Sequence, residues 1–309
     1  MKYNYGCPSK GEIFQVKTPK INKESHKNLF GFLNVYKPAG MTSHDVVSIL
    51  RKKTGIKQIG HTGTLDPFAE GVLPICVGKA TRLIEYLDDD KEYLATIQFG
   101  FSTTTYDIEG EKTFISDKKV NEQEIKDKLK IFEGEIEQIP PIYSAIKVKG
   151  KKLYEYARKG ETIEITPRKV TVNNIELKYF DEKLQQAQIL VKCSKGTYIR
   201  SIANDLGEKL RAGGHLIKLV RTQAGKFNIK NSIKLDNIEP QKNIINPLEI
   251  IDFPKIEVND DDLYKIKNGI SLNKNTDCTN LVILIYNNEK ICAVGQNING
   301  SIKLKKVFL

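Results

Sequence analysis

The amino-acid sequence predicts an α+β protein with a large, mainly antiparallel sheet and a smaller β-rich module at its C-terminal end. Strand-like alternation recurs along much of the chain, whereas helix-like spacing is confined to a few short segments. After about residue 245 the strand-like runs become shorter and asparagine becomes frequent. Together these observations favour an α+β class over a regular alternation of strands and helices.

The first elements are a strand and a helix. Residues 31–36 (GFLNVY) have strand composition, and the turn formers at 37–40 end the strand. Either Thr42 or Ser43 can then cap a helix whose apolar positions fall on one face. We expect this helix to stop near Gly55.

A long loop and a second strand–helix pair are expected next. Residues 58–76 hold many turn formers and little periodicity, so we expect a long ordered loop. Residues 93–99 alternate between apolar and polar side chains and predict a strand. Asn121 and Glu124 form a plausible capping box for a helix that ends at Gly134.

Two strands and one helix complete the main region. Residues 168–180 and 187–193 have strand patterns. Apolar residues from Ile199 to Leu210 recur at spacings of four and three, which predicts a helix. The pair Gly213-Gly214 is expected to close it.

We expect three regions along the chain. Residues 1–28 are polar and lysine-rich and form an N-terminal extension, residues 29–245 form the main domain, and residues 246–309 form the β-rich module. The pair Asn287-Asn288 is a hairpin signal within that module.

Composition excludes several classes of protein. With 28% charged and 39% hydrophobic residues, the 309-residue chain is not disordered. It contains no apolar run of the roughly 18 residues that a membrane span requires, and its start does not have the pattern of a secretory signal. The cysteines are odd in number and scattered, so we expect buried free thiols in a cytoplasmic protein. They are Cys7, Cys76, Cys193, Cys278 and Cys292.

The net charge suggests a polyanionic partner. The formal net charge is +11 and the isoelectric point is about 9.2. Residues 251–309 hold 8 basic and 7 acidic side chains, so the excess belongs to the first 250 residues. Nucleic acid is one partner that such an excess favours.

The segment with the strongest chemical signal is Gly60-His61-Thr62-Gly63-Thr64-Leu65-Asp66-Pro67. An isolated Asp-Pro pair is usually a turn, and a lone histidine usually caps or packs. Here the segment is accompanied, in order along the chain, by several other motifs. These are Lys37-Pro38, Lys91-x-Tyr93, Gly100-x-x-Thr103-x-Thr105-x-Asp107-x-x-Gly110, Pro140-Pro141-x-Tyr143-Ser144-Ala145-x-Lys147, Ser194-Lys195-Gly196-Thr197-Tyr198-Ile199-Arg200, Gly214-His215-Leu216-x-x-Leu219 and Arg221-Thr222.

This set of motifs resembles the bacterial tRNA pseudouridine synthase B family, often called TruB, from about residue 31 to 227. The resemblance implies a pseudouridine-synthase fold with helices flanking the sheet. It also implies an isomerase that flips uridine 55 out of the T-loop of tRNA and converts it to pseudouridine. No cofactor is implied, and the sequence has neither a P-loop nor a dinucleotide-binding motif. We expect a monomer whose partner is the tRNA T-arm, with no metal, membrane or nucleotide cofactor.

The resemblance assigns the catalytic roles residue by residue. Asp66 matches the catalytic aspartate, which attacks either the sugar or the uracil ring. Arg200 matches the arginine that pairs with it, and a nearby cation favours the ionised carboxylate. Tyr93 matches the tyrosine that stacks on the target base and acts as a general acid or base.

Four further residues are assigned to substrate binding. Tyr198 and Leu219 match pocket residues, and periodicity alone would place both in the core. His61 matches the histidine that enters the T-loop. Lys37 belongs to a loop that is either structural or in contact with RNA.

Two regions are expected to hold RNA. Residues from about 141 to 168 are rich in lysine, arginine and tyrosine, which is typical either of a solvated face or of an insertion that grips RNA and becomes ordered on binding. Residues 246–309 stand where the family carries a small RNA-binding module called PUA.

Two other functions remain open at this point. The first is an RNA-binding or tRNA-folding factor whose main role does not need catalysis; it would share the basic surface but not require Asp66. The second is a related synthase that acts on ribosomal RNA or with guide RNA, which the lack of long lysine-rich tails disfavours.

Overall fold

The computed structural model describes residues 29–144, 146–161, 163–274 and 280–309. The predicted extension at 1–28, together with Cys7, Ala145 and Cys278, lies outside the described residues. The other three cysteines are free and buried, as predicted. None of the helices in these described ranges is long and apolar enough to cross a membrane.

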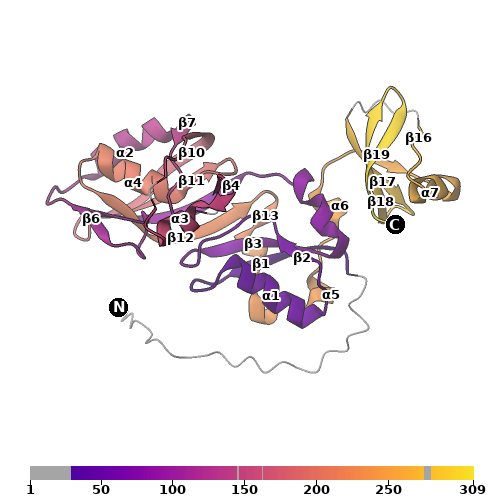
Figure 1. The fold of residues 1–309 in the computed structure, drawn as a ribbon, viewed down its shortest axis with the longest axis horizontal. Helices are drawn as coiled ribbons and strands as arrows, with labels where there is room; N and C mark the ends of the chain where they lie inside the picture. The colour runs from indigo at the N-terminus through magenta and orange to yellow at the C-terminus, as the bar shows by residue number, and fades with distance from the viewer. Residues whose placement is uncertain (1–28, 145, 162, 275–279) are drawn as a thin grey trace.

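A ten-stranded sheet forms the main body (Figure 1), with the order β14-β1-β3-β12-β4-β11-β10-β7. In addition, β2 pairs with β3 and β13 pairs with β12. The pairs β1–β14 and β3–β12 are parallel and the others antiparallel, so the predicted mainly antiparallel sheet is confirmed. The strands are β1 (Gly31–Lys37), β2 (Ile59–His61), β3 (Glu70–Val77), β4 (Lys91–Phe99), β7 (Gly134–Gln138), β10 (Arg168–Asp181), β11 (Gln186–Cys193), β12 (Gly214–Ala224), β13 (Phe227–Asn228) and β14 (Ile233–Lys234).

Three helices pack against the same core as this sheet: α1 (Ser43–Thr54), α2 (Glu122–Leu129) and α4 (Ile199–Lys209). Of the two alternatives for the first cap, Thr42 is the N-cap, and its capping box with Asp45 leaves the Ser43 side chain free for another contact. Gly55 ends α1 with a left-handed backbone, and the predicted capping box ahead of α2 is present.

The prediction of a long loop at 58–76 is wrong at both ends of that range. Residues 59–61 form β2, residues 70–77 form β3, and only 62–69 are irregular. β3 is buried along almost its whole length. A strand that is buried on both faces shows no alternation, so the period of two that marks the other strands is absent here. The prediction that Gly213-Gly214 closes α4 also differs from the structure, because Gly214 is the first residue of β12.

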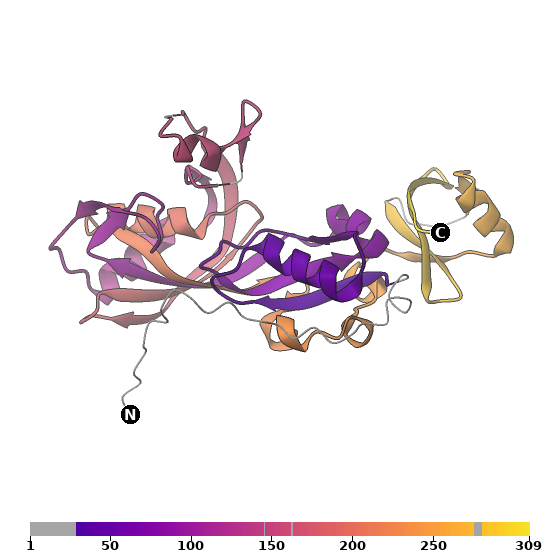
Figure 2. The ribbon, with the colours of Figure 1, turned by 60° about the horizontal axis from the view of Figure 1, so that its bottom comes forward.

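A short hairpin and a projecting segment lie beside the main sheet. The hairpin consists of β5 (Phe101–Thr103) and β6 (Lys112–Ile115). The segment contains β8 (Lys147–Val148), β9 (Lys151–Lys152) and α3 (Leu153–Arg158), and it rises away from the sheet in Figure 2. The remaining short helices are η1 (Gly78–Tyr86), η2 (Lys130–Phe132), η3 (Ile229–Asn231), η4 (Leu235–Asn237), α5 (Pro240–Asn243) and α6 (Pro247–Ile250).

A second sheet of five strands forms the C-terminal module, with the order β15-β17-β18-β19-β16. Both residues of the predicted hairpin turn, Asn287 and Asn288, have positive φ angles, as a tight turn between β17 and β18 requires. The elements are β15 (Lys255–Glu257), α7 (Asp260–Lys267), β16 (Leu272–Asn273), β17 (Leu281–Tyr286), β18 (Lys290–Ile298) and β19 (Ser301–Val307).

The module is apolar on both faces of its sheet. In β17, Val282 and Leu284 pack in a cluster with Ile266 of α7. The alternate residues Ile283 and Ile285 belong to a different cluster, which contains Phe32 of the main body. The period of two therefore buries one face inside the module and the other against the main domain.

We predict that Gly71→Ala destabilises the protein much more than Gly40→Ala. Both glycines have positive φ angles, 110° at Gly71 and 80° at Gly40. A Cβ atom at Gly71 would lie 2.3 Å from the carbonyl oxygen of Arg221, whereas one at Gly40 would meet nothing within 4 Å. Gly40→Ala should cost about 1 kcal/mol through backbone strain alone, and the clash should add about 2 kcal/mol more at Gly71. Urea denaturation of both variants measures this difference, and equal losses would contradict it.

Candidate active site

The irregular loop at 62–69 carries Asp66, and its neighbours are fixed on both sides. The Ser43 hydroxyl accepts a hydrogen bond from the Leu65 N–H (2.8 Å) and donates one to the Leu65 carbonyl (3.0 Å). On the other side, the Pro67 carbonyl accepts a bond from the Gly40 N–H (2.8 Å). The backbone at Asp66 is therefore held by the start of α1 and by the turn after β1.

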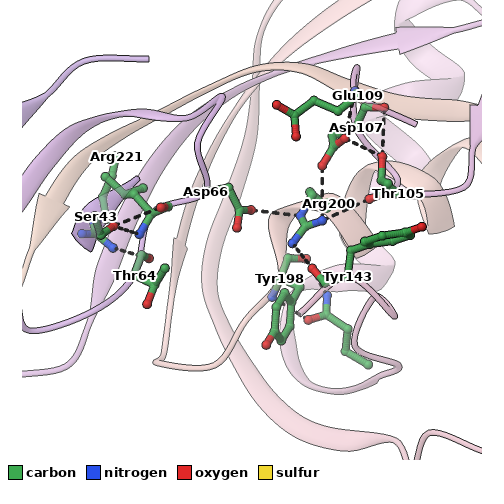
Figure 3. Close-up of polar contacts among 12 residues, drawn as sticks. Ser43, Thr64, Asp66, Thr105, Asp107, Glu109, Tyr143, Tyr198, Arg200 and Arg221 are labelled. Carbon is green, nitrogen blue, oxygen red and sulfur yellow. Dashed lines mark hydrogen bonds and ion pairs between the residues drawn. The ribbon is translucent and has the colours of Figure 1, made fainter. Parts of the chain in front are cut away.

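Asp66 faces Arg200, which projects from the first turn of α4 (Figure 3). Asp66 Oδ2 lies 3.0 Å from Arg200 Nε. The arginine side chain is only 5% exposed, while that of Asp66 is 34% exposed. The carboxylate thus has one edge on a buried cation and keeps some access to solvent. The predicted pairing of these two residues is present.

Arg200 makes three further contacts within the protein. Its Nη1 donates to Asp107 Oδ2 (3.2 Å) and to the Thr105 carbonyl (3.2 Å), and its Nη2 donates to the Tyr143 carbonyl (3.0 Å). Asp107 is itself buried and accepts a bond from the Thr105 hydroxyl (2.5 Å). A planar guanidinium with five donors can serve these acceptors at once, which an ammonium group cannot.

Burial raises the pKa of Asp66 above its ordinary value of 3.8. Arg200 lowers this pKa, the nearby Asp107 carboxylate raises it, and Lys37 lowers it. The favourable effect of Arg200 that the sequence predicted is therefore present but smaller than the cost of burial. A carboxylate that is held poorly solvated in this way is a stronger nucleophile than one in water.

Gln138 connects α4 to the chain that leads into the projecting segment. Its side-chain amide donates to the Tyr198 carbonyl (2.9 Å), and its carbonyl accepts from the Tyr198 N–H (2.7 Å). The Ser201 hydroxyl donates to the Ile139 carbonyl (2.9 Å). These bonds fix the residue just before α4, and with it the direction in which Arg200 points.

Of the remaining predicted residues, Tyr93 and Tyr198 lie close enough to Asp66 for its charge to affect their pKa values. Tyr93 lies on β4 and Leu219 on β12, and both are nearly buried. Burial raises the pKa of the Tyr93 hydroxyl, and Asp66 is among the charges close enough to affect it. Tyr198 is half-buried, and burial also raises its pKa.

His61 stands at the end of β2, directly before the loop. Its ring is half-buried, and its pKa is lowered by burial, by Arg221 and by His44. The Nδ1 atom is buried and has no hydrogen-bond partner among the described residues. The lowered pKa favours the neutral imidazole at physiological pH.

Lys37 lies in the protein interior and not at the surface. Its side chain is fully buried, and Nζ donates to the carbonyls of Pro38 (2.8 Å), Met41 (2.6 Å) and Pro67 (3.3 Å). Burial lowers its pKa to about 8. Of the two roles that the sequence left open for Lys37, this geometry fits the structural one, since an RNA contact would require these bonds to break.

Sequence reasoning assigned no role to three residues that build the site: Asp107, Gln138 and Arg221. Asp107 and Arg221 lie in motifs that the sequence singled out, but both bond to segments remote in sequence. Gln138 had only the neighbouring proline pair as a signal. No set of three histidine, cysteine, aspartate or glutamate side chains in the described ranges is arranged to hold a metal ion.

Two family models match most of the chain. Residues 51–199 match "TruB family pseudouridylate synthase (N terminal domain)", and residues 200–249 match "tRNA pseudouridylate synthase B C-terminal domain". The tRNA pseudouridine synthase B of Caldanaerobacter subterraneus subsp. tengcongensis is 46% identical over 282 residues, which cover 90% of this chain and 99% of that protein. That of Staphylococcus haemolyticus is 46% identical over 302 residues, with the same coverage.

Chains of similar fold occur in solved structures of larger complexes. A chain in the "Crystal Structure of a Cbf5-Nop10-Gar1 Complex" is 27% identical with a TM-score of 0.68, covering 94% of this chain and 88% of that one. A chain of an H/ACA RNP bound to a substrate RNA containing 2'-deoxyuridine is 26% identical with a TM-score of 0.66, covering 91% and 85%. The large mixed sheet is therefore the pseudouridine-synthase fold, and the C-terminal module is PUA-like.

We predict opposite effects of two aspartate-to-asparagine changes on stability. Asp107→Asn removes a buried charge from Arg200 and should lower the free energy of unfolding by about 3 kcal/mol. Asp66→Asn should leave it unchanged or raise it, because a carboxyl group whose pKa is raised on folding disfavours the folded state at neutral pH. Urea denaturation at pH 7 compares the two, and a loss of stability in Asp66→Asn as large as that in Asp107→Asn would contradict this account.

Proposed function

This chain belongs to the TruB family of pseudouridylate synthases, and from that premise we propose that it isomerises uridine 55 in the T-loop of tRNA, with Asp66 as the nucleophile. The family is enzymatic, and its curated members carry the name tRNA pseudouridine synthase B. The observation that supports the specific proposal is the Asp66–Arg200 pair, in which a buried cation orients a partly exposed carboxylate.

The reaction asks little of the protein beyond a nucleophile, a proton carrier and a pocket. The bond between N1 of uracil and the sugar carbon breaks, the base turns, and a bond from C5 to the same sugar carbon forms. C5 loses its proton and N1 gains one, so the overall change is an isomerisation. Asp66 can attack the sugar or the ring in this scheme, and the exposed edge of its carboxylate is the part that meets the substrate.

The pocket residues suit a base that has left its stack. Tyr93 offers an aromatic face and a hydroxyl for proton transfer, while Leu219 and Tyr198 offer apolar surface. His61 precedes the nucleophile loop and is neutral, so it can enter an RNA loop without an ionic partner. We propose these four residues as the substrate-binding set, with Lys37 acting through the loop that it supports.

The projecting segment is the proposed RNA-gripping insertion, at about 141–168. It contains exposed lysines at 147, 149, 151 and 159. Tyr156 donates to the Val148 carbonyl (3.1 Å) and lies under the Lys151 ammonium, so part of its aromatic content supports the segment itself. The Tyr143 carbonyl at the root of this segment accepts from Arg200, which links the insertion to the nucleophile.

The proposal also covers the substrate, the roles of the domains, the oligomeric state and the cellular location. We propose the tRNA T-arm as the substrate, 29–245 as the catalytic domain and 246–309 as an RNA-binding module. The enzyme is proposed to act as a cytoplasmic monomer. The near-neutral charge of residues 251–309 puts most of the attraction for RNA on the larger domain.

We predict that Asp66→Asn abolishes pseudouridine formation and leaves tRNA binding largely intact. Asparagine keeps the size of the side chain but cannot act as the nucleophile. Tritium release from tRNA labelled at C5 of uridine measures turnover, and filter binding measures affinity. A matched transcript with cytidine at position 55 should release no tritium from the wild-type enzyme above background.

The control variant is Asp127→Asn, which makes the same change on the exposed face of α2. It should keep wild-type activity. Retained activity in Asp66→Asn would overturn the mechanism. If cells carrying Asp66→Asn behave as wild type while a deletion has a defect, the main role is that of an RNA-binding or tRNA-folding factor.

We predict an acidic limb in the pH dependence of kcat/KM that lies above pH 3.8. The reaction requires ionised Asp66, and its raised pKa means that protonation begins at a higher pH than for an ordinary aspartate. Because Asp107 contributes to that rise, Asp107→Asn should move the limb to lower pH. Single-turnover rates between pH 4 and 8 measure both, and a wild-type rate that does not fall as the pH approaches 4 would contradict the assignment.

A further inference from the structure

Arg221 is a fully buried cation on β12, the strand at the centre of the main sheet. None of the ion pairs within the described ranges involves Arg221, whereas Arg200 pairs with two carboxylates, those of Asp66 and Asp107. A buried charge that lacks an opposite charge is costly and is retained only where many hydrogen bonds satisfy it. The hydrogen-bond partners of this guanidinium therefore indicate its role.

The guanidinium of Arg221 holds the backbone of the loop that precedes Asp66. Its Nη2 donates to the Gly63 carbonyl (3.1 Å) and its Nη1 to the Thr64 carbonyl (3.3 Å). Its Nε donates to the Val72 carbonyl (2.7 Å) at the far end of the loop, in β3. One side chain therefore joins the two ends of the loop, and it lies near Ser43 and Thr64 in Figure 3.

The same side chain lies beside Tyr93. Arg221 and Tyr93 are directly opposite each other in the pairing of β12 with β4. The charged or titratable groups that face the Tyr93 hydroxyl are Arg221, Cys193 of β11 and Asp66 of the loop. Of these three, only Arg221 favours the ionised hydroxyl, and it opposes the effect of burial.

We propose that Arg221 is a positioning residue of the reaction, which fixes the loop so that Asp66 meets Arg200 and places a positive charge beside the Tyr93 side chain. The inference rests on the proposed function, because it takes Asp66 and Tyr93 as reacting groups. Arg221 contacts the Tyr93 side chain directly, and it reaches Asp66 through the loop backbone. It acts through the backbone of one group and through the electrostatic environment of the other.

The test compares two substitutions that separate charge from geometry. Arg221→Gln removes the charge, and Arg221→Lys keeps the charge but loses the planar set of donors. The control is Lys218→Gln, which removes an exposed charge from the same strand, where Lys218 pairs with Glu70 (3.3 Å). Each variant also carries 3-fluorotyrosine at position 93, so that fluorine NMR reports the pKa of that hydroxyl without any need for activity.

Arg221→Gln should raise the pKa of the fluorinated Tyr93 by about one unit or more, while Arg221→Lys and Lys218→Gln shift it by less than half of that. Both Arg221 variants should lower kcat by about 100-fold through misplacement of Asp66, with KM for tRNA within a few-fold of wild type. An unchanged pKa in folded Arg221→Gln, or a kcat within twofold of wild type in either variant, would overturn the proposal.

Two further outcomes are distinguishable. If Arg221→Gln does not fold, as urea denaturation and circular dichroism would reveal, Arg221→Lys alone decides the matter: a folded variant with lowered kcat supports the positioning role, and full activity overturns it. If the wild-type protein forms no pseudouridine, the proposed function fails. In that case the fluorine NMR shift still tests the effect of Arg221 on Tyr93.

Discussion

The site depends on one buried guanidinium, that of Arg200. It joins the loop that carries Asp66, the turn that carries Asp107, and the root of the projecting segment at Tyr143. These three segments come from different parts of the chain. The rigid fork of arginine makes this possible, because its donors point in fixed directions in one plane. The position of Asp66, the proposed nucleophile, and the position of the proposed insertion are thus set by the same group.

The protein supports this arrangement at some cost in stability. Burial raises the pKa of Asp66 despite the nearby cation, so the ionised carboxylate is less favourable in the folded protein than in water. Two more buried cations, Lys37 and Arg221, bond to carbonyl oxygens of the surrounding loops. Their hydrogen bonds replace the secondary structure that the loop lacks, which keeps the backbone rigid where the side chain must be precise.

The regions that contain the two sheets differ in their charge and in how they use apolar surface. The basic excess lies within the first 250 residues, and several of its lysines are exposed on the projecting segment. The C-terminal module instead uses the two faces of β17 for apolar packing, one toward α7 and one toward the main body. Its place against the main body therefore depends on apolar contacts.

The sequence by itself determined the elements that have local signals and the identity of the central residues. A cap at Thr42 or Ser43 and a capping box at Asn121 marked helix starts, and the resemblance of the motifs around Asp66 and Arg200 to a known family implied their pairing. Tertiary structure alone decided that β3 is a strand, that Lys37 faces inward, and that Arg200 also bonds to Asp107 and Tyr143. The physical reason is range: periodicity and caps report burial within a few residues, whereas the Arg200–Asp107 bond spans 93 residues and exists only because the sheet topology brings those segments together.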